Sequence, residues 1–256
     1  MTTINLNADM GESYGHFHIG NDKEMMKFIK SASIACGFHA GDPIIMADTV
    51  RLAKEHGVSV GAHPAFNDLW GFGRREIRMS ARDIEYMVAY QIGALSGIAA
   101  GAGVKVTHVK PHGALSNMAH VDAEYAGAIT RAIKSVDPSL IFVAIACSEM
   151  VAAGHKEGLR VAEEAFCDRT YDDTGKLASR KFPDALIRDP EQAVQQVLSF
   201  ITERAVITRT GKKIPSQIRT FCTHGDEPTG PAVASAVGAA LEKNGIRVVP
   251  LPELTY

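Results

Sequence analysis

Short apolar runs with strand character alternate with longer amphipathic stretches along the whole chain. Strands that alternate with helices pair in parallel through right-handed crossovers, so this order predicts an α/β fold. Eight runs predict strands: Ile4–Asp9, Ser31–Cys36, Val58–Ala62, Val104–Lys110, Leu140–Ala146, Leu159–Ala165, Ile218–Thr223 and Arg247–Pro250. Seven stretches predict helices: Asp22–Lys30, Pro43–His56, Ser80–Ala102, Ala123–Val136, Ser148–Glu157, Pro190–Arg204 and Pro231–Asn244.

The chain length limits how such a parallel sheet can be arranged. At 256 residues the chain suits two small domains or one (β/α) barrel, because such barrels commonly have about 250 residues. No linker, low-complexity segment or short repeat divides the chain. We therefore expect one domain over residues 1–256: a distorted (β/α) TIM-like barrel of seven to eight parallel strands, rather than a doubly wound sheet.

Composition excludes several classes of function. The 27 basic and 29 acidic side chains leave a formal charge of −2, so the chain has no basic excess for binding nucleic acid. It has no run of 18 apolar residues that would span a membrane, and it starts with no charged leader. The four cysteines form no C-x-x-C pair, which argues against a disulfide framework or a structural zinc site. These features predict a soluble, cytoplasmic protein.

Titratable side chains gather where the predicted strands end. In a barrel, the carboxyl ends of the strands surround one mouth, where the active sites of such folds are built. The residues at these positions are Asp9, Glu12, His39, Asp42, His63, Lys110, His112, Glu164, Asp168, Arg169, His224, Asp226 and Glu227. The opposite ends of the same strands carry fewer titratable groups, so this asymmetry predicts an enzyme.

The first predicted strand indicates a polar barrel interior. Asn5, Asn7 and Asp9 share one face of this strand, while Ile4 and Leu6 lie on the other. The apolar face would pack against helices, which directs the polar row inward. Because unpaired buried amides and carboxylates are costly, this row predicts either a polar pocket or an internal hydrogen-bonded network without substrate.

The segment 108–112 combines two histidines with a lysine. Pro111 argues against a helix here, and on a strand His108, Lys110 and His112 would face one side. A lysine between two imidazoles is expected to have a lowered pKa and to polarise a carboxylate or carbonyl. Alternatively, one of the histidines only caps the following turn.

Glycine-containing loops carry the other candidate groups. His39 and His63 each lie in a short loop bounded by glycine, which lets the backbone approach a ligand closely. The segment 70–75 predicts a mobile loop that offers Arg74 and Arg75 to an anion or to a salt bridge. The chain contains no P-loop, so any nucleotide would be held in another way or by a partner.

Six ordered blocks of the sequence resemble signature blocks of the LamB/YcsF family. They are NLNADMGES, SASIACGFHAGDP, GAHPAFNDLWGFGRR, HVKPHGAL, FCDRTYDDTGKL and CTHGDEP, and the resemblance runs from about residue 4 to residue 251. It implies a barrel related to the polysaccharide deacetylases. It also implies a component of ATP-dependent 5-oxoprolinase, which opens 5-oxo-L-proline to L-glutamate with ATP hydrolysis to ADP and phosphate. Two partner subunits, B and C, would complete this enzyme. Ser116 and Glu227 depart from the family pattern near the proposed mouth.

The resemblance leaves the metal content open. Related deacetylases bind a metal through an aspartate and an H-x-x-x-H pair, but Pro111 interrupts the only such pair in this chain. If zinc or another transition metal is present, we expect Asp9, His63 and His112 to hold it. ATP would bring Mg²⁺.

The implied reaction suggests roles for proton-transferring residues. Asp9 or His63 would act as a general base on water, and His224 or His112 would assist departure of the ring nitrogen. Asp226, on the same loop as His224, would orient its imidazole. His39 is expected in the same catalytic group.

The implied substrates suggest roles for the remaining candidates. Lys110 or Arg169 would bind the carboxylate of 5-oxoproline, and Glu12 and Asp168 would hold a magnesium-bound phosphate. Three further residues are expected to bind substrate or cofactor: Asn7, Arg74 and Glu164. Two alternatives remain open: a metal-dependent deacetylase or amidohydrolase on a carbohydrate or small amide, and a non-catalytic lactam-binding subunit.

Overall fold

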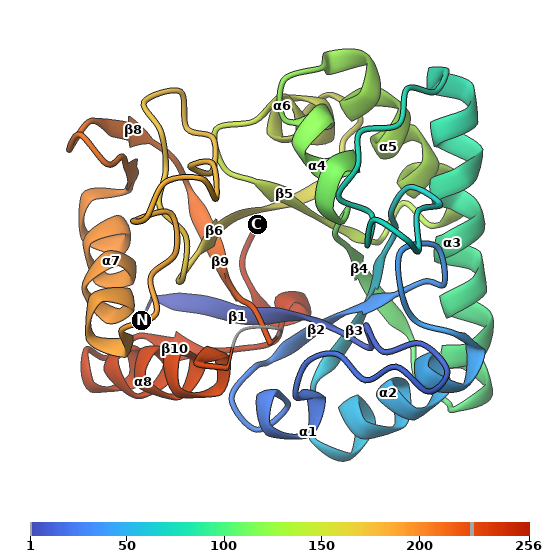
Figure 1. The fold of residues 1–256 in the computed structure, drawn as a ribbon, viewed down its shortest axis with the longest axis horizontal. Coiled ribbons are helices and arrows are strands. Elements are labelled where there is room, and N and C mark those ends of the chain that lie inside the picture. Colours follow the sequence, from blue (N-terminus) through green and yellow to red (C-terminus); the bar gives the residue numbers. More distant parts are fainter. Residues whose placement is uncertain (1, 226–227) are drawn as a thin grey trace.

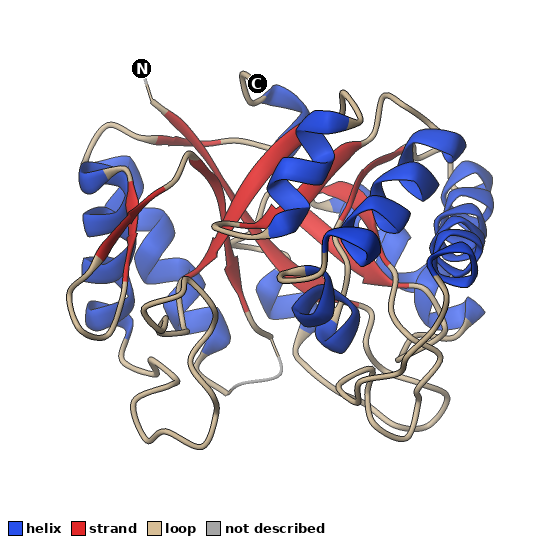
Figure 2. Ribbon diagram, turned by 90° about the horizontal axis from the view of Figure 1, so that it is seen from above, coloured by secondary structure: helices blue, strands red, loops and turns tan. Residues whose placement is uncertain are grey.

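Seven parallel strands close into a barrel in the computed structural model, which describes residues 2–225 and 228–256. In spatial order the strands are β1 (Thr3–Met10), β2 (Ser31–Ala35), β3 (Ser59–His63), β4 (Val106–Val109), β5 (Ile141–Ile145), β6 (Arg160–Phe166) and β9 (Ile218–Thr223). β9 pairs with both β6 and β1, which closes the ring. Helices surround the strands (Figure 1), and loops gather at the end opposite to both chain ends (Figure 2). The predicted distorted (β/α) barrel is confirmed.

Helices follow most of the barrel strands. They are α1 (Asp22–Met25), α2 (Pro43–Glu55), α3 (Ala81–Gly101), α4 (Gly113–Ala119), α5 (Ala123–Val136), α6 (Glu149–Lys156), α7 (Pro190–Glu203) and α8 (Gly230–Lys243). The prediction of a helix over Asp22–Lys30 was too long, because the Lys30 N–H leaves the helical pattern and donates to the Leu6 carbonyl. The short helix α4 was not predicted.

An antiparallel hairpin, β7 (Ala205–Ile207) with β8 (Lys213–Pro215), was also not predicted. It lies outside the barrel and supports the long loop between β6 and α7. Arg209 forms two hydrogen bonds of 2.7 Å with Asp184, and Thr208 donates to Asp173 at 2.6 Å. The loop over residues 167–189 is therefore braced from outside the barrel.

The last predicted strand does not enter the ring. β10 (Arg247–Val248) pairs only with the start of β1, and the chain then turns at Leu251–Glu253 into a 3₁₀ helix. Three apolar residues of this segment fill the amino end of the barrel against Ile141, Val143 and Ala162; they are Val249, Leu251 and Leu254. The carboxyl-terminal segment thus closes one end of the barrel and leaves the other end for a site.

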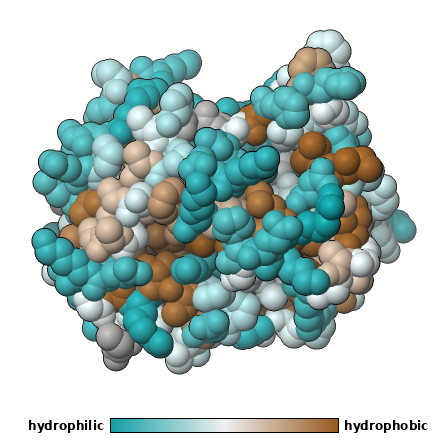
Figure 3. Space-filling view, turned by 90° about the horizontal axis from the view of Figure 1, so that it is seen from below, coloured by the Kyte–Doolittle hydropathy of each residue, from teal (hydrophilic) through white to brown (hydrophobic). Residues whose placement is uncertain are grey.

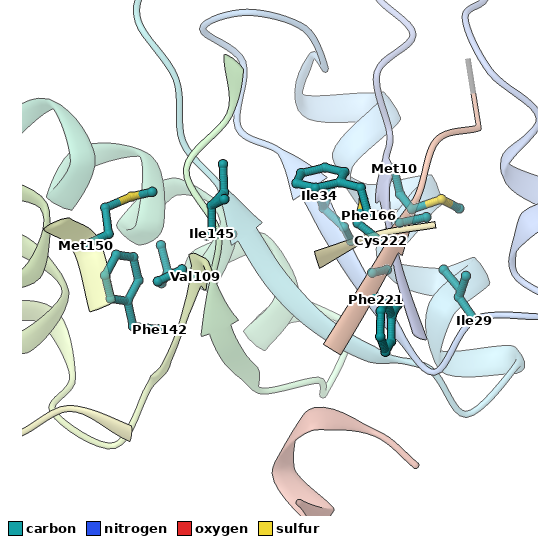
Figure 4. Close-up of a cluster of buried hydrophobic side chains, with 14 of the residues drawn as sticks. Met10, Ile29, Ile34, Val109, Phe142, Ile145, Met150, Phe166, Phe221 and Cys222 are labelled. Carbon is teal, nitrogen blue, oxygen red and sulfur yellow. The ribbon is translucent and has the colours of Figure 1, made fainter. Parts of the chain in front are cut away.

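The outer faces of the strands form the main hydrophobic core. Figure 4 shows part of this core, in which strand residues such as Val109 and Phe142 are buried in one cluster with Met150 of α6. Each fully buried side chain of this size contributes about 1.5–3 kcal/mol through the area that it removes from water. The apolar faces of the strands hold the helices, which leaves the inner faces for polar residues.

The polar interior predicted from β1 is present. Asn5 donates to Ser31 at 2.8 Å and accepts from Thr220 at 2.7 Å, and Asn7 donates to Thr220 at 2.7 Å. Deep in the barrel the polar row is therefore a closed hydrogen-bonded network. The pocket begins only at the level of Asp9.

The start of α2 provides a test of local stability. Asp42 accepts hydrogen bonds from the backbone N–H groups of Ile44 and Ile45, and also from Gly15 in the loop after β1. Replacing Asp42 by alanine is expected to lower the free energy of unfolding by about 1–2 kcal/mol, because three N–H groups lose their acceptor. Urea unfolding measures this change. Asp48→Ala, in the middle of the same helix, is the control and should change stability by less than about 0.5 kcal/mol.

The outer surface carries both kinds of residue. On the face seen in Figure 3, hydrophobic residues are interspersed with hydrophilic ones. Within residues 2–225 and 228–256, no helix has the length and apolar character needed to cross a bilayer.

Candidate active site

A pocket of about 360 Å³ lies at the carboxyl ends of the barrel strands. The candidates that line it are Asp9, Glu12, His63, Arg74, Lys110, His112, Glu164, Arg169 and His224, together with the departing residue Ser116. Three further candidates contact lining residues from behind: Asn7, His39 and Asp168. Asp226 and Glu227 lie outside the described residues. Residues from separate strands therefore meet in one pocket, as the barrel predicts.

Lys110, directly after β4, lies at the base of the pocket and is almost completely buried. Its Nζ lies 2.9 Å from Asp9 Oδ1, 2.9 Å from Glu164 Oε1, 3.0 Å from Asn7 Oδ1 and 3.0 Å from Cys222 Sγ. Burial alone would lower the pKa of Lys110, but the neighbouring Asp9, Cys222 and Glu164 raise it well above its usual value. The prediction of a lowered pKa was wrong. With both carboxylates already paired to it, Lys110 is poorly suited to bind the carboxylate of a substrate.

His108 does not belong to the mouth of the barrel. Its ring fills the space beside Gly61, where any Cβ would collide with it, and its Nδ1 lies 2.9 Å from the Thr107 hydroxyl. Burial lowers the pKa of His108 to about 3. His108 and His112 therefore do not act as an H-x-x-x-H pair, because the two rings lie at different depths of the barrel.

Three histidines and a glutamate form a buried cluster on one side of the pocket; we call Glu12, His39, His63 and His112 the histidine cluster. His63 Nε2 lies 3.0 Å from His112 Nδ1, and Glu12 Oε1 lies 3.0 Å from His39 Nε2 and 3.5 Å from His112 Nδ1. Burial and the neighbouring imidazoles lower the pKa of His39 and of His112 well below the usual range. These two rings are therefore neutral at physiological pH.

Backbone carbonyls determine which nitrogens of this cluster carry hydrogen. His63 Nδ1 lies 2.6 Å from the Lys110 carbonyl oxygen, and His112 Nε2 lies 2.9 Å from that of Phe72. A carbonyl oxygen only accepts, so both nitrogens donate. The two remaining ring nitrogens, His63 Nε2 and His112 Nδ1, consequently face each other.

The loop over residues 66–75 holds this cluster from outside. Phe72 adopts φ 54° and Gly73 φ 64°, and a Cβ at Gly73 would lie 2.8 Å from His39 and 2.9 Å from His112. Only glycine allows this approach. Arg75 pairs with the buried Asp68, which is the salt bridge predicted as one of two uses of this arginine. Arg74 instead lines the pocket.

His224, after β9, forms a dyad with Asp168, after β6. Its Nδ1 lies 2.8 and 3.0 Å from the two carboxylate oxygens, and its backbone N–H donates to the same group at 3.1 Å. Burial would raise the pKa of Asp168, but its contacts with His224 hold the pKa below the usual value. Asp168 therefore orients His224, the role expected of Asp226 from the sequence. Both Asp168 oxygens face His224, which argues against the predicted use of Asp168 for a magnesium-bound phosphate.

The opposite wall of the pocket is cationic. Arg169 is buried, donates to the carbonyls of Ala178 and Ala185, and has no carboxylate partner within ion-pair distance among the described residues. Burial and the charge of Arg180 lower the pKa of Arg169. Lys176 and Arg180 of the same loop also line the pocket. Lys176 and Arg180 were not predicted because their loop shows no strand or helix periodicity; the FCDRTYDDTGKL block contains Lys176 but ends before Arg180.

Residues 4–256 match the model of the LamB/YcsF family. The chain belongs to the LamB/YcsF family. This LamB/YcsF chain is 53% identical over 248 residues to the 5-oxoprolinase A subunit of Rhodopseudomonas palustris strain BisB5, covering 96% of this chain and 98% of that one. It superposes on the crystal structure of the lactam utilization protein from Thermus thermophilus with a TM-score of 0.91. The two chains are 45% identical, and the match covers 98% of this chain and 100% of that one.

More distant structures share only the architecture of this LamB/YcsF chain. The polysaccharide deacetylase of Bacillus cereus superposes with a TM-score of 0.50 and 14% identity, over 100% of this chain and 95% of that one. At this identity the likeness shows the fold alone. It confirms the predicted polysaccharide-deacetylase-like barrel.

Proposed function

We propose that this chain is the 5-oxoprolinase subunit whose pocket opens 5-oxo-L-proline to L-glutamate, as a single catalytic domain over residues 1–256. The names of the relatives at 53% and 45% identity support this reaction class. The observation that carries the proposal is the pocket itself. It places a buried guanidinium without a carboxylate partner among the described residues, Arg169, together with an aspartate–histidine dyad.

The substrate carboxylate would bind to Arg169. A buried cation without a counter-ion is costly, and a planar guanidinium can hold a carboxylate through two parallel hydrogen bonds. Of the two residues expected to bind this carboxylate, Lys110 already neutralises Asp9 and Glu164. Arg169 is therefore the better candidate.

His224 would transfer the proton that the ring nitrogen needs in order to leave. Asp168 fixes Nδ1 of His224 as a donor and orients the imidazole for acid–base chemistry with the substrate. His224, Asp9 and Cys222 each have one side-chain N, O or S atom within 4.8 Å of the corresponding atoms of the other two. The His224 ring therefore faces the base of the pocket. The dyad thus supplies an oriented acid, while Lys110 and His63 hold Asp9 as an anion with a pKa well below its usual value, against the opposing effect of burial.

ATP would supply the activation that a resonance-stabilised lactam requires, by phosphorylation of the amide oxygen with Mg²⁺ present. The sequence has no P-loop, which is compatible with a nucleotide site on a partner. The partners would be the two further 5-oxoprolinase subunits, B and C. Glu12 of this chain remains a candidate for contact with the magnesium-bound phosphate.

Reconstitution tests this function directly. The purified chain, both partner subunits, ATP and 5-oxoproline should release glutamate, and omission of this chain should abolish the release. An intact, assembled complex that forms no glutamate would refute the proposal.

Arg169 provides a second test. Arg169→Met is expected to raise KM for 5-oxoproline by about 10- to 100-fold, because a charged hydrogen-bonded pair contributes about 1.5–3 kcal/mol. Steady-state glutamate release measures KM. Arg78→Met, an exposed arginine outside the pocket, should leave KM unchanged. An unchanged KM in Arg169→Met would exclude Arg169 as the carboxylate-binding residue.

The histidine cluster favours a second candidate function, a metal-dependent deacetylase or amidohydrolase. The donors that fit a metal are His63 and His112 with Glu12 or Asp9, which includes the triad expected from the sequence. A divalent ion at this position would polarise a carbonyl oxygen or acidify a water molecule. ATP-independent amide cleavage by the isolated chain would support this alternative.

A further inference from the structure

Two ring nitrogens in the histidine cluster face each other at a distance that lets them bind one cation. His63 Nε2 and His112 Nδ1 are 3.0 Å apart, and the opposite nitrogen of each ring donates to a backbone carbonyl. Metal-binding histidines have this arrangement, in which the second ring N–H is held by a carbonyl and fixes the tautomer.

The spacing of the surrounding donors agrees with one small ion. Four ligands at about 2.0–2.1 Å from a tetrahedral ion lie about 3.3–3.4 Å from one another. His112 Nδ1 is 3.5 Å from Glu12 Oε1, and His63 Nε2 is 3.3 Å from Asp9 Oδ2. Together with the 3.0 Å between the two imidazoles, these distances lie close to the edges of a coordination polyhedron.

Ring orientation separates ligands from supporting residues. His39 stacks on His112 with ring centroids 3.8 Å apart and an interplanar angle of 10°, whereas His63 and His112 meet at 83°. An imidazole lone pair lies in the plane of its ring, so one ion cannot lie in both of two stacked planes. His63 and His112 can share an ion, but His39 and His112 cannot. The 3.0 Å contact with Glu12 makes His39 a positioning residue for this carboxylate.

The loop outside the cluster gives independent support. Phe72 is one of the few non-glycine residues with positive φ among those described, and its carbonyl accepts from His112 Nε2. Such backbone conformations cost about 1–3 kcal/mol and are concentrated at functional sites. The strained turn at Phe72 and Gly73 directs the Phe72 carbonyl at His112 Nε2, the ring nitrogen opposite the one that faces His63.

From this geometry we propose that His63 Nε2, His112 Nδ1 and the Glu12 carboxylate bind one divalent first-row transition metal ion, with His39 orienting Glu12. Two imidazoles and one carboxylate suit Zn²⁺, Fe²⁺ or Co²⁺. Asp9 lies at the edge of this set and is already paired with Lys110. The site differs from the triad expected from the sequence by the inclusion of Glu12. It occupies the pocket of the proposed function, but its test does not depend on that function.

Metal titration tests the proposal without any activity measurement. The chelator-treated chain is titrated with Co²⁺, whose visible absorption reports nitrogen–oxygen coordination, and Zn²⁺ displacement is followed by calorimetry. We expect one equivalent per chain. His63→Ala, His112→Ala and Glu12→Gln should each weaken binding by at least about 10- to 100-fold. His155→Ala, an exposed histidine on α6, is the matched control and should bind as the native chain does.

His39 is tested by a pair of substitutions. His39→Ala should weaken Co²⁺ binding and alter its spectrum, whereas His39→Gln, which can still donate to Glu12, should restore much of the affinity. Thermal unfolding of each metal-free variant identifies any that fails to fold, and Glu12→Gln then serves as the least disruptive substitution.

Absence of Co²⁺ and Zn²⁺ binding would overturn the proposal, and so would stoichiometric binding that persists in His63→Ala, His112→Ala and Glu12→Gln. In that case, a proton shared between His63 Nε2 and His112 Nδ1 would account for their 3.0 Å contact. Glutamate release by a metal-free complex would leave the proposed function intact. It would show only that the reaction does not require this ion.

Discussion

Replacement of His224 by asparagine is expected to lower the rate of glutamate release by about 10²- to 10⁴-fold, the range typical for loss of a general acid or base. The asparagine amide can still donate to Asp168, so the loop after β9 should keep its position, while the atom that transfers the proton is gone. Binding of 5-oxoproline, measured by equilibrium dialysis, should be nearly unchanged. The rate is measured with the reconstituted complex at saturating ATP.

Two further variants define what this result means. Asp168→Asn should also lower turnover, because His224 loses the carboxylate that fixes its tautomer, whereas His155→Asn on the surface should have no effect. A His224→Asn chain that turns over normally would exclude the dyad as the proton donor. Loss of lactam affinity in each pocket variant, with normal turnover of what still binds, would favour the non-catalytic lactam-binding alternative.

Replacement of Lys110 by methionine is expected to destabilise the chain by about 3–5 kcal/mol. Removing one partner of a buried ion pair leaves uncompensated charge, and here Asp9 and Glu164 both lose their cation. Burial would raise the pKa of Asp9, but His63 and Lys110 hold it well below its usual value. Loss of Lys110 therefore raises this pKa. The deficit should be largest near pH 7.5 and should shrink at acidic pH, where Asp9 takes up a proton in the variant.

Urea unfolding at pH 7.5 and at pH 5 measures this effect. Adding Glu164→Gln to Lys110→Met should recover part of the lost stability, because it removes one of the two unpaired buried charges. Lys105→Met, on the surface beside Asp137, is the control and should cost less than about 1 kcal/mol. An unfolding free energy of Lys110→Met equal to that of the native chain would contradict the assignment of Lys110 as the central charge of the pocket.

The barrel was predictable because its strands are short, apolar and regularly spaced. Every predicted strand overlaps an observed one, and the run Ile218–Thr223 agrees at both ends. The eighth run failed as a barrel strand for a tertiary reason: after Val248 the chain turns inward to fill the amino end of the barrel. Helix α4 and the β7–β8 hairpin were missed because they are too short for their periodicity to be distinguished from a loop.

Membership of the pocket was predictable, but most pairings within it were not. Parallel strands bring their carboxyl ends together whatever their sequence, so residues after different strands had to meet. Which groups pair depends on strand order and depth. Lys110 contacts Asp9 across the barrel, and the His108 ring lies against Gly61 whereas the His112 ring lies against Gly73. The Asp168–His224 pair joins two neighbouring strands, β6 and β9, that are far apart in the sequence.

Opening of the lactam in the pocket of this chain can be tested by the rate at which a reconstituted complex releases glutamate. The complex is assembled with both partner subunits, ATP, and either the native chain or a chain carrying Arg169→Met and His224→Asn. We predict that the double variant, shown to be folded and assembled, forms glutamate at less than about one thousandth of the native rate. Glutamate release at the native rate by that assembled variant would show that the lactam is not opened in this pocket.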